Sequence, residues 1–283
     1  MITFPRMLSV ALRVLAVLVV AYAAIVLLAW AFQERLAFPA PAGPLPTPVE
    51  AGIPDGQLVA VTAADSVRLK GWYLPPNPVP QASSAPGLIW FYGNMETIGG
   101  IAPILREFRP PGTGLLVLDY RGYGQSEGKP TEKGLYRDAD AAWQFLTQRP
   151  EIDSTRIAVY GRSVGSAVAL YLATENPVRA VILESAFTSG REMAQEHYSM
   201  IPIGLLHLRL NNVERAARLT APLLVFHGTD DWIAPLPMGR AVAEAGRAEE
   251  FVAIEGAGHN DTYDVGGAMY RDRLHAFLKK HLN

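Results

Sequence analysis

Ser163 lies at the centre of residues 161–165, whose sequence Gly-Arg-Ser-Val-Gly matches the pattern G-x-S-x-G. An apolar run at 157–160 precedes this segment, and a helix-compatible run at 166–173 follows it. A strand, a tight turn and a helix in this order hold a serine hydroxyl out of a sheet, where it can attack a carbonyl carbon. The turn needs glycines on both sides because a Cβ there would meet neighbouring backbone. Ser163 is therefore the predicted nucleophile.

A serine nucleophile needs a base, and His259 is the best-placed histidine. It lies in a glycine-flanked loop directly after the apolar run at 250–254, downstream of several candidate acids. The competing histidines lie in a strandless segment (His197 and His207), at the end of an apolar run (His227) or in the final helical stretch (His275 and His281). The sequence therefore predicts His259 as the general base.

The acid that orients the base should follow the preceding strand. Asp230 and Asp231 are neighbours just after the apolar run at 222–226. Glu184, which ends the run at 180–183, is a more distant candidate for the same role. The residues alone leave these alternatives open.

An oxyanion hole needs two N–H groups aimed at the developing negative charge. Val164, which follows the serine, offers one. The second is predicted from Gly93 or Asn94, because this segment follows the early apolar run at 88–92 and its glycine lets backbone approach a substrate. Such a site requires no metal ion and no organic cofactor.

The composition agrees with an enzyme of one large domain. The chain has 283 residues, of which 49% are apolar, enough to fill a sizeable core and to argue against disorder. The net charge of −2 without long charged runs does not suit a nucleic-acid binder. The absence of cysteine excludes disulfides, cysteine nucleophiles and thiolate metal sites.

Short apolar runs that alternate with helical stretches predict an α/β fold. A hairpin is expected first, from the alternating segments 58–62 and 67–74. Further strands are expected at 88–92, 114–118, 157–160, 180–183, 222–226 and 250–254, and helices at 135–148, 166–174 and 238–245. Continuous apolar strands separated by helices are typical of a parallel sheet with helices on both faces. Residues 187–220 lack a clear strand and are either a lid insertion or an ordinary helical excursion.

The N-terminus predicts a membrane anchor. Residues 14–32 carry no charge, and as a helix they would be about 28 Å long, close to the thickness of a bilayer core. Trp30 stands near the far end, as interfacial anchors do. Arg6 and Arg13 before the span predict that the domain lies on the outer, periplasmic or extracytoplasmic, face. A cleaved signal peptide is the alternative, since alanine pairs within the run could serve a signal peptidase. The expected divisions are an anchor at 1–35, a stiff proline-rich linker at 36–57 and a catalytic domain at 58–283.

Four motifs together resemble the α/β-hydrolase superfamily. They are residues 119–128, 161–165, 227–231 and 256–261, in the order of that family. More narrowly, the chain is similar to the membrane-anchored abhydrolase-domain and serine-aminopeptidase-like branch. The resemblance implies an α/β-hydrolase fold, with Asp231 as the acid. It makes Asp119 and Arg121 structural braces. One departure is Tyr92, where the family usually has histidine.

The expected activity is hydrolysis of a carboxylic ester through an acyl-enzyme on Ser163. The ester substrates that this expectation includes are lipid-like or acylated molecules. A peptidase or amidase of the same fold is an alternative, and so is a non-catalytic binding protein that keeps the fold. The expected partners are a small-molecule substrate and the membrane, with no nucleic acid. Nothing in the sequence identifies a protein partner.

Overall fold

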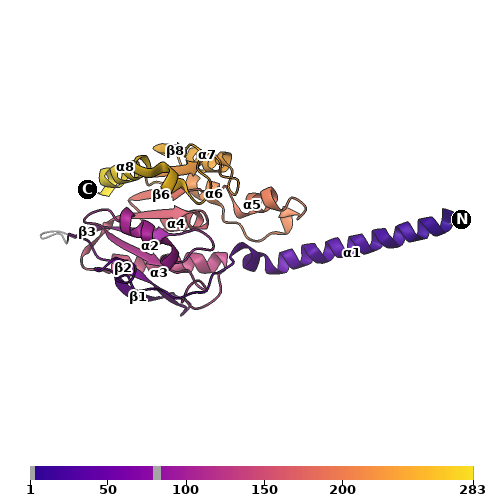
Figure 1. Ribbon diagram of the computed structural model, residues 1–283, viewed down its shortest axis with the longest axis horizontal. Helices are drawn as coiled ribbons and strands as arrows, with labels where there is room; N and C mark the ends of the chain where they lie inside the picture. Colours follow the sequence, from indigo (N-terminus) through magenta and orange to yellow (C-terminus); the bar gives the residue numbers. More distant parts are fainter. Residues whose placement is uncertain (1–3, 79–83, 283) are drawn as a thin grey trace.

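A computed structural model describes residues 4–78 and 84–282 and contains one eight-stranded sheet (Figure 1). Its strands are β1 (Gln57–Thr62), β2 (Arg68–Leu74), β3 (Ala85–Phe91), β4 (Gly114–Leu118), β5 (Ile152–Arg162), β6 (Ala180–Glu184), β7 (Leu223–Gly228) and β8 (Glu250–Ile254). Their spatial order is β1-β2-β4-β3-β5-β6-β7-β8. All pairs from β4 to β8 are parallel, and only β2 runs antiparallel to both of its neighbours.

The predicted strands and the hairpin are all present. β1 and β2 pair directly, with Thr62 opposite Arg68 across the turn. Every residue of β4, β6 and β7 is buried, which explains why these strands appear in the sequence as unbroken apolar runs rather than as alternating ones. The expected fold, a mostly parallel sheet of the α/β-hydrolase type, is confirmed.

Helices form a layer on each face of the sheet. They are α2 (Ile98–Phe108), α3 (Glu132–Thr147), α4 (Val164–Glu175), α6 (Asn212–Ala217), α7 (Leu236–Ala245) and α8 (Thr262–Leu282). Helix α5 (Gly190–His197) packs instead against the short 3-10 turn at Ile203–Leu205. Within one layer α3 packs against α4, α4 against α6, and α6 against α7. On the other face α8 crosses β5 to β8, and its Tyr263 reaches Glu107 of α2. The loops after the parallel strands therefore meet at one edge of the sheet, where open α/β sheets carry their sites.

Helix α1 (Phe4–Ala37) projects from the domain as a long rod (Figure 1). The stretch Leu8–Ala37 is long and apolar enough to cross a membrane, and it is the one helix of this kind in the part of the chain described here. A signal sequence would satisfy the same criteria of length and composition.

The segment expected to be a stiff linker, 36–57, packs against the domain instead of holding it away from α1. Phe38 and Ile53 are buried in the core, at 2% and 4% exposed. The carbonyl of Pro41 accepts the Gly124 N–H at 2.9 Å, and that of Pro46 accepts the Trp72 indole N–H at 3.0 Å. Prolines lack an N–H but keep their carbonyls as acceptors, so a proline-rich segment can still bind along a domain surface.

Half of the residues in the region 187–220 are helical. It contains α5, a short 3-10 turn η1 (Ile203–Leu205) and α6, and it leaves the sheet between β6 and β7. Its first part lies beside α1 (Figure 1).

The loop after β4 braces the sheet. The Arg121 guanidinium contacts Asp138 of α3 and, at 2.8 Å, Asp65 in the β1–β2 turn. The Asp119 carboxylate accepts the Tyr92 hydroxyl at 2.9 Å and the Ile98 N–H at 3.0 Å. Both residues make bracing contacts, as the family resemblance implies for them.

Because of these ion pairs, we expect the stability of the fold to depend on pH in the acidic range. The hydrogen bond from Arg121 lowers the pKa of Asp65 to about 2, from an ordinary value near 3.8. A depressed carboxyl pKa stabilises the fold above the unfolded-state pKa, and the stabilisation is lost as pH falls through the folded-state value. We expect Asp65→Asn to lower the free energy of unfolding by roughly 1–2 kcal/mol at pH 7. Between pH 4 and pH 2, the Tm of the variant should fall less than the Tm of the parent. Thermal unfolding scans in detergent would measure both values. Parallel curves would contradict the assignment.

Candidate active site

Ser163 occupies a strained turn between β5 and α4. Its φ is +51° and its ψ is −118°, a left-handed conformation that a serine adopts only when the surroundings enforce it. The enforcing contacts are backbone ones: the Ser163 N–H donates to the Glu184 carbonyl of β6 at 2.9 Å, and the Ser163 carbonyl accepts the Ser166 N–H at 2.9 Å. The side chain stays half-buried and accessible at the carboxyl edge of the sheet.

The two glycines of the turn are required by close backbone approach. A Cβ at Gly161 would lie 2.4 Å from the Gly165 carbonyl oxygen. A Cβ at Gly165 would lie 2.1 Å from the Phe91 carbonyl oxygen of β3. The turn is thus wedged between its own helix and the neighbouring strand, which explains the G-x-S-x-G spacing.

His259 lies between Ser163 and Asp231. Its Nε2 is 2.8 Å from Ser163 Oγ, and its Nδ1 is 2.8 Å from Asp231 Oδ2. A carboxylate only accepts hydrogen bonds, so Nδ1 carries the proton and Nε2 is free to accept the serine hydroxyl. The imidazole is 7% exposed and Asp231 is 4% exposed, which keeps both in a region of low dielectric. This arrangement can remove the proton from Ser163 as its oxygen attacks.

The Asp231 carboxylate is held ionised by its neighbours. Burial alone would raise its pKa, but hydrogen bonds from His227 and His259, the charge of His259 and the Ala234 N–H together lower that pKa well below the usual range. Oδ1 accepts the Ile233 and Ala234 N–H groups at 3.0 and 2.8 Å. Asp231 therefore keeps a negative charge beside the imidazole through the physiological pH range.

His227 is a second partner of Asp231 that the sequence analysis set aside. It is fully buried, with Nε2 2.7 Å from the Ala234 carbonyl and 3.3 Å from Asp231 Oδ2. Gly239 of α7 lies so close to the ring that a Cβ there would be 2.1 Å from Nδ1. The sequence feature that could have indicated this contact is the position of His227, four residues before Asp231 in the same motif.

The other candidate acids lie elsewhere. Asp230 is exposed and accepts only the Thr229 hydroxyl, at 3.2 Å, among described side chains. Glu184 is buried and is bound by the hydroxyls of Tyr160, Tyr270 and Thr262 and by Arg162. Neither contacts the imidazole of His259, whose Nδ1 is taken by Asp231.

Three residues were proposed for the oxyanion hole, and their amides differ in availability. Val164 is the first residue of α4, so its N–H has no acceptor within the helix. The Gly93 N–H donates to Glu96 Oε2 at 2.6 Å and is therefore engaged. The Asn94 side chain is bound by the Tyr123 hydroxyl at 2.6 Å and donates to the Ala37 carbonyl of α1 at 2.7 Å. These contacts fix the loop next to Ser163, where a Cβ at Gly93 would lie 3.5 Å from the Ser163 Cβ.

Tyr92 takes a bracing role where the family usually has histidine. Its ring is fully buried, and its hydroxyl donates to Asp119 and accepts the Tyr120 N–H at 3.2 Å. Burial raises the pKa of this phenol well above its ordinary value, so the hydroxyl stays a donor. Tyr92 thus ties the end of β3 to the end of β4.

Arg162, the residue before the nucleophile, joins the loops of the site. It is 7% exposed, and its guanidinium contacts Glu96 of the oxyanion loop and Glu184 of β6. It also donates to Asn260 Oδ1 at 2.7 Å, next to His259. Arg162 and Glu96 could not be predicted as partners from the sequence, because nothing along the chain indicates that they would meet.

Arg162→Met should therefore destabilise the protein strongly. Removing one partner of a buried ion pair leaves uncompensated charge, which costs about 3–5 kcal/mol. Arg68→Met is the matched control, because Arg68 and Glu127 are 68% and 47% exposed and such pairs contribute about 0–1 kcal/mol. Chemical unfolding in detergent would measure both values. Equal losses in the two variants would contradict a bracing role for Arg162.

No group of three or more His, Asp or Glu side chains within residues 4–78 and 84–282 is arranged to hold a metal ion.

Comparisons with known proteins bear on the family. The serine aminopeptidase S33 family model matches residues 86–212. An uncharacterized protein of Mycobacterium tuberculosis strain H37Rv is 36% identical over 270 residues, 95% of either chain. The human alpha/beta hydrolase domain-containing protein 17B is 38% identical over 169 residues, which cover 59% of this chain and 57% of the human one.

Solved structures share the fold. The esterase Pf2001 of Pyrococcus furiosus superposes with a TM-score of 0.67 at 20% identity, over 86% of this chain and all of that one. A puromycin-hydrolyzing peptidase of Mycobacterium tuberculosis gives a TM-score of 0.67 at 19% identity, over 81% of this chain and 39% of that one. Sequence, fold and relatives agree, and the chain belongs to the α/β-hydrolase superfamily, in its abhydrolase-domain and serine-aminopeptidase-like branch.

Proposed function

We propose that the protein is a serine hydrolase that cleaves carboxylic esters through an acyl-enzyme, with Ser163, His259 and Asp231 as its catalytic triad. The observation that carries this proposal is the chain of two 2.8 Å contacts from Ser163 Oγ through the His259 ring to Asp231. Hydrogen-bond distance between nucleophile and base, with the base oriented by a carboxylate, is the geometry that nucleophilic acyl transfer requires.

The first half-reaction forms the acyl-enzyme. Ser163 Oγ attacks the carbonyl carbon while its proton passes to His259 Nε2, and Asp231 stabilises the resulting imidazolium. The tetrahedral oxygen receives hydrogen bonds from the Val164 and Asn94 amides. When the intermediate collapses, the C–O bond to the leaving alcohol breaks, and His259 returns the proton to that alcohol. Water then repeats the sequence and releases the acid.

Esters are the proposed substrates because an alcohol leaves the tetrahedral intermediate more easily than an amine does. The triad therefore needs to assist the leaving group of an ester less than that of an amide. The apolar helix α1 beside the site favours lipid-like or acylated esters. A peptidase or amidase activity uses the same residues, and the peptidase among the structural neighbours supports it only as the second candidate. Parallel turnover of an ester and the matching amide would separate the two. A binding protein without activity would turn over neither.

We also propose that α1 is a membrane anchor that stays attached to the domain. Gln33 in α1 is 6% exposed because it is bound to the domain, contacts that a cleaved signal peptide would not need. The arginines before the span favour a domain on the outer face. Membrane fractionation followed by N-terminal sequencing would test retention, and a mature protein that begins after residue 31 would contradict it.

The decisive experiment is labelling of the full chain in detergent by a fluorescent fluorophosphonate. This probe phosphonylates a serine only when a neighbouring base activates it. We expect rapid labelling of the parent, none of Ser163→Ala and very slow labelling of His259→Ala. Ser154→Ala, at an exposed serine of β5, should keep its label. A folded parent that does not react would overturn the proposal.

A further inference from the structure

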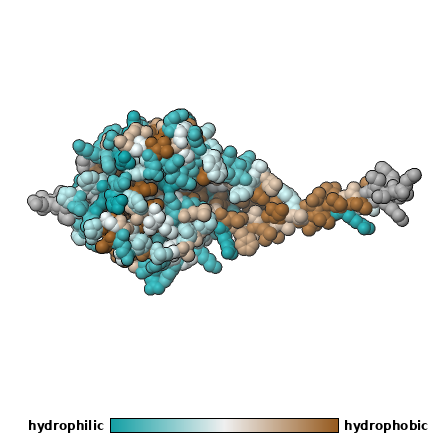
Figure 2. All heavy atoms as spheres, viewed as in Figure 1, coloured by the Kyte–Doolittle hydropathy of each residue, from teal (hydrophilic) through white to brown (hydrophobic). Residues whose placement is uncertain are grey.

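Helix α1 is longer than a bilayer core is thick. Its apolar part, Leu8–Ala37, has 30 residues and spans about 45 Å, whereas the hydrocarbon core is about 30 Å thick. Part of its length therefore lies outside the hydrocarbon core when the helix stands along the membrane normal. Figure 2 shows its brown apolar side chains continuing towards a domain whose surface is mostly hydrophilic.

One face of the domain-proximal half of α1 contacts the segment between β6 and β7. Val26 and Ala29 are half-buried and Gln33 is buried, at the spacing of one helical stripe. Gln33 Oε1 accepts the N–H groups of His207 and Leu208 at 2.8 and 2.9 Å. The segment is thereby fixed along the helix.

The contact extends deep along α1 to Tyr22. Its hydroxyl donates to the Met200 carbonyl at 2.8 Å. Met200 belongs to residues 198–206, here called the tip, a stretch without any charged residue. Within the tip, the N–H of Ile201 donates to the Tyr198 carbonyl at 2.8 Å. Backbone polar groups inside a bilayer must find hydrogen-bond partners within the protein. The hydrogen bond from Tyr22 of the spanning helix to a tip carbonyl meets this requirement for a tip that lies in the membrane.

The position of Tyr22 sets the depth of the tip. If the hydrocarbon core covers the uncharged run 14–32, Tyr22 lies about 15 Å inside the boundary nearest the domain. If Trp30 marks the interface instead, Tyr22 lies about 12 Å inside. Both placements bring Met200 to the depth of the acyl chains.

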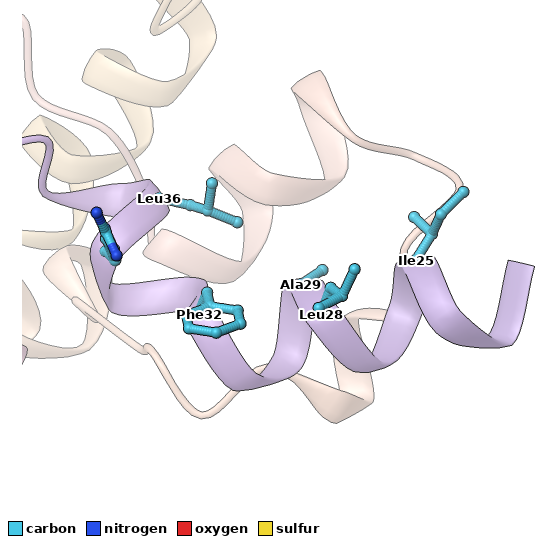
Figure 3. Close-up of a pocket in the computed structure, with 6 residues that line it drawn as sticks. Ile25, Leu28, Ala29, Phe32 and Leu36 are labelled. Carbon is cyan, nitrogen blue, oxygen red and sulfur yellow. The ribbon is translucent and has the colours of Figure 1, made fainter. Parts of the chain in front are cut away.

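The tip presents apolar side chains to its surroundings. Tyr198 and Met200 are 65% and 66% exposed, and Ile203 and Leu205 are 37% and 47% exposed. An open apolar groove also runs along α1, and it is lined by Ile25, Leu28, Ala29, Phe32, Arg35 and Leu36 (Figure 3). Contiguous exposed apolar surface of this kind marks an interaction site.

The same segment borders the candidate active site. His197, just before the tip, binds the Ile233 carbonyl at 2.8 Å, two residues from Asp231. Trp232, 74% exposed, packs edge-on against the His197 ring. From the other side, the last residue of α1, Ala37, binds Asn94 of the oxyanion loop.

We propose that the tip is a second membrane-inserted element, which enters the leaflet nearest the domain beside α1 and presents the Ser163 site to acyl chains in that leaflet. The bilayer is the partner that this surface fits, because the tip is bonded to the spanning helix at bilayer depth. The consequence for substrate rests on the proposed hydrolase function: the preferred esters are those of long acyl chains held in a membrane.

The test uses the full chain reconstituted in phosphatidylcholine vesicles. Because the protein has no cysteine, Met200→Cys, Val17→Cys and Leu58→Cys each carry one environment-sensitive NBD label. The Met200 side chain is free for this change, since Tyr22 binds only its carbonyl. We expect blue-shifted emission and quenching by brominated lipid at positions 200 and 17, and neither effect at the exposed position 58 on β1. Water-like emission at position 200 overturns the proposal, whether or not position 17 is quenched.

An activity comparison separates this inference from the proposed function. Met200→Asp should lose at least about tenfold in turnover of a long-chain ester carried in the vesicles, because a carboxylate resists burial in lipid. Its turnover of a water-soluble acetate ester should be unchanged. Leu58→Asp, with the same charge on a distant surface, should keep both activities. Equal activity of Met200→Asp on the vesicle substrate overturns the inference alone, whereas a parent inactive on both esters, even when detergent-solubilised, overturns the hydrolase proposal.

Discussion

Asp231→Asn should lower kcat on a soluble chromogenic ester by about 10⁴-fold. The amide can present its NH₂ group to His259 Nδ1, which stabilises the wrong tautomer and removes the charge that supports the imidazolium. His227 would lose its carboxylate partner at the same time. Pre-steady-state kinetics of the full chain in detergent would measure the rate of acylation directly.

Asp230→Asn is the control for this change because the two aspartates are neighbours with different surroundings. Asp230 is exposed, so its variant should retain kcat within about twofold and Tm within about 2 °C. If the two variants were equally active, Asp231 would not be the acid. A large loss in Asp230→Asn alone would assign the role to that residue instead.

Gly165→Ala should remove both the serine's reactivity and part of the fold's stability. The added Cβ would lie 2.1 Å from the Phe91 carbonyl oxygen and 2.7 Å from that of Tyr92, and backbone cannot move aside as a side chain can. Separating α4 from β3 should cost about 3 kcal/mol or more. For a domain of this size that is a fall in Tm of roughly 6–12 °C. Fluorophosphonate labelling should be lost because the oxyanion loop and Ser163 no longer meet.

Gly43→Ala provides the comparison for this change. Gly43 has open space where its Cβ would be, so its variant should match the parent in Tm and in labelling rate. A Gly165→Ala protein with the parent's Tm and labelling rate would show that the turn tolerates a Cβ, contrary to the packing described here.

The sequence alone was enough to predict the central strands β4, β6 and β7, because their residues are buried on both faces and therefore appear as unbroken apolar runs. It predicted the turn at Ser163 for a similar reason, since the two glycines report a steric demand that is local to the chain. The order of these elements predicted an α/β fold, the motif resemblance narrowed it to the α/β-hydrolase fold, and that fold was confirmed. The candidate nucleophile and base followed from their positions after strands, and their roles stay predictions.

The choice between Asp230 and Asp231 could not be made from residue types, because both are aspartates on one turn. The structure separates them by burial: one side chain points to solvent and the other lies 2.8 Å from His259. The contacts of Arg162 with Glu96 and Asn260 were likewise invisible, since they join segments 66 and 98 residues apart. Long-range pairing of this kind depends on how the loops converge at the sheet edge.

By itself, the sequence determined which elements form and which of them carry reactive side chains, because these properties depend on local periodicity and on single residues. Only the tertiary structure decided that the apolar N-terminal helix is bound to the domain. Gln33 anchors His207 and Leu208, Tyr22 reaches Met200, and Ala37 touches Asn94. The physical reason is that a charge-free run has the same pattern whether it faces lipid alone or also faces protein. The polar groups that distinguish these states find their partners only when distant segments meet.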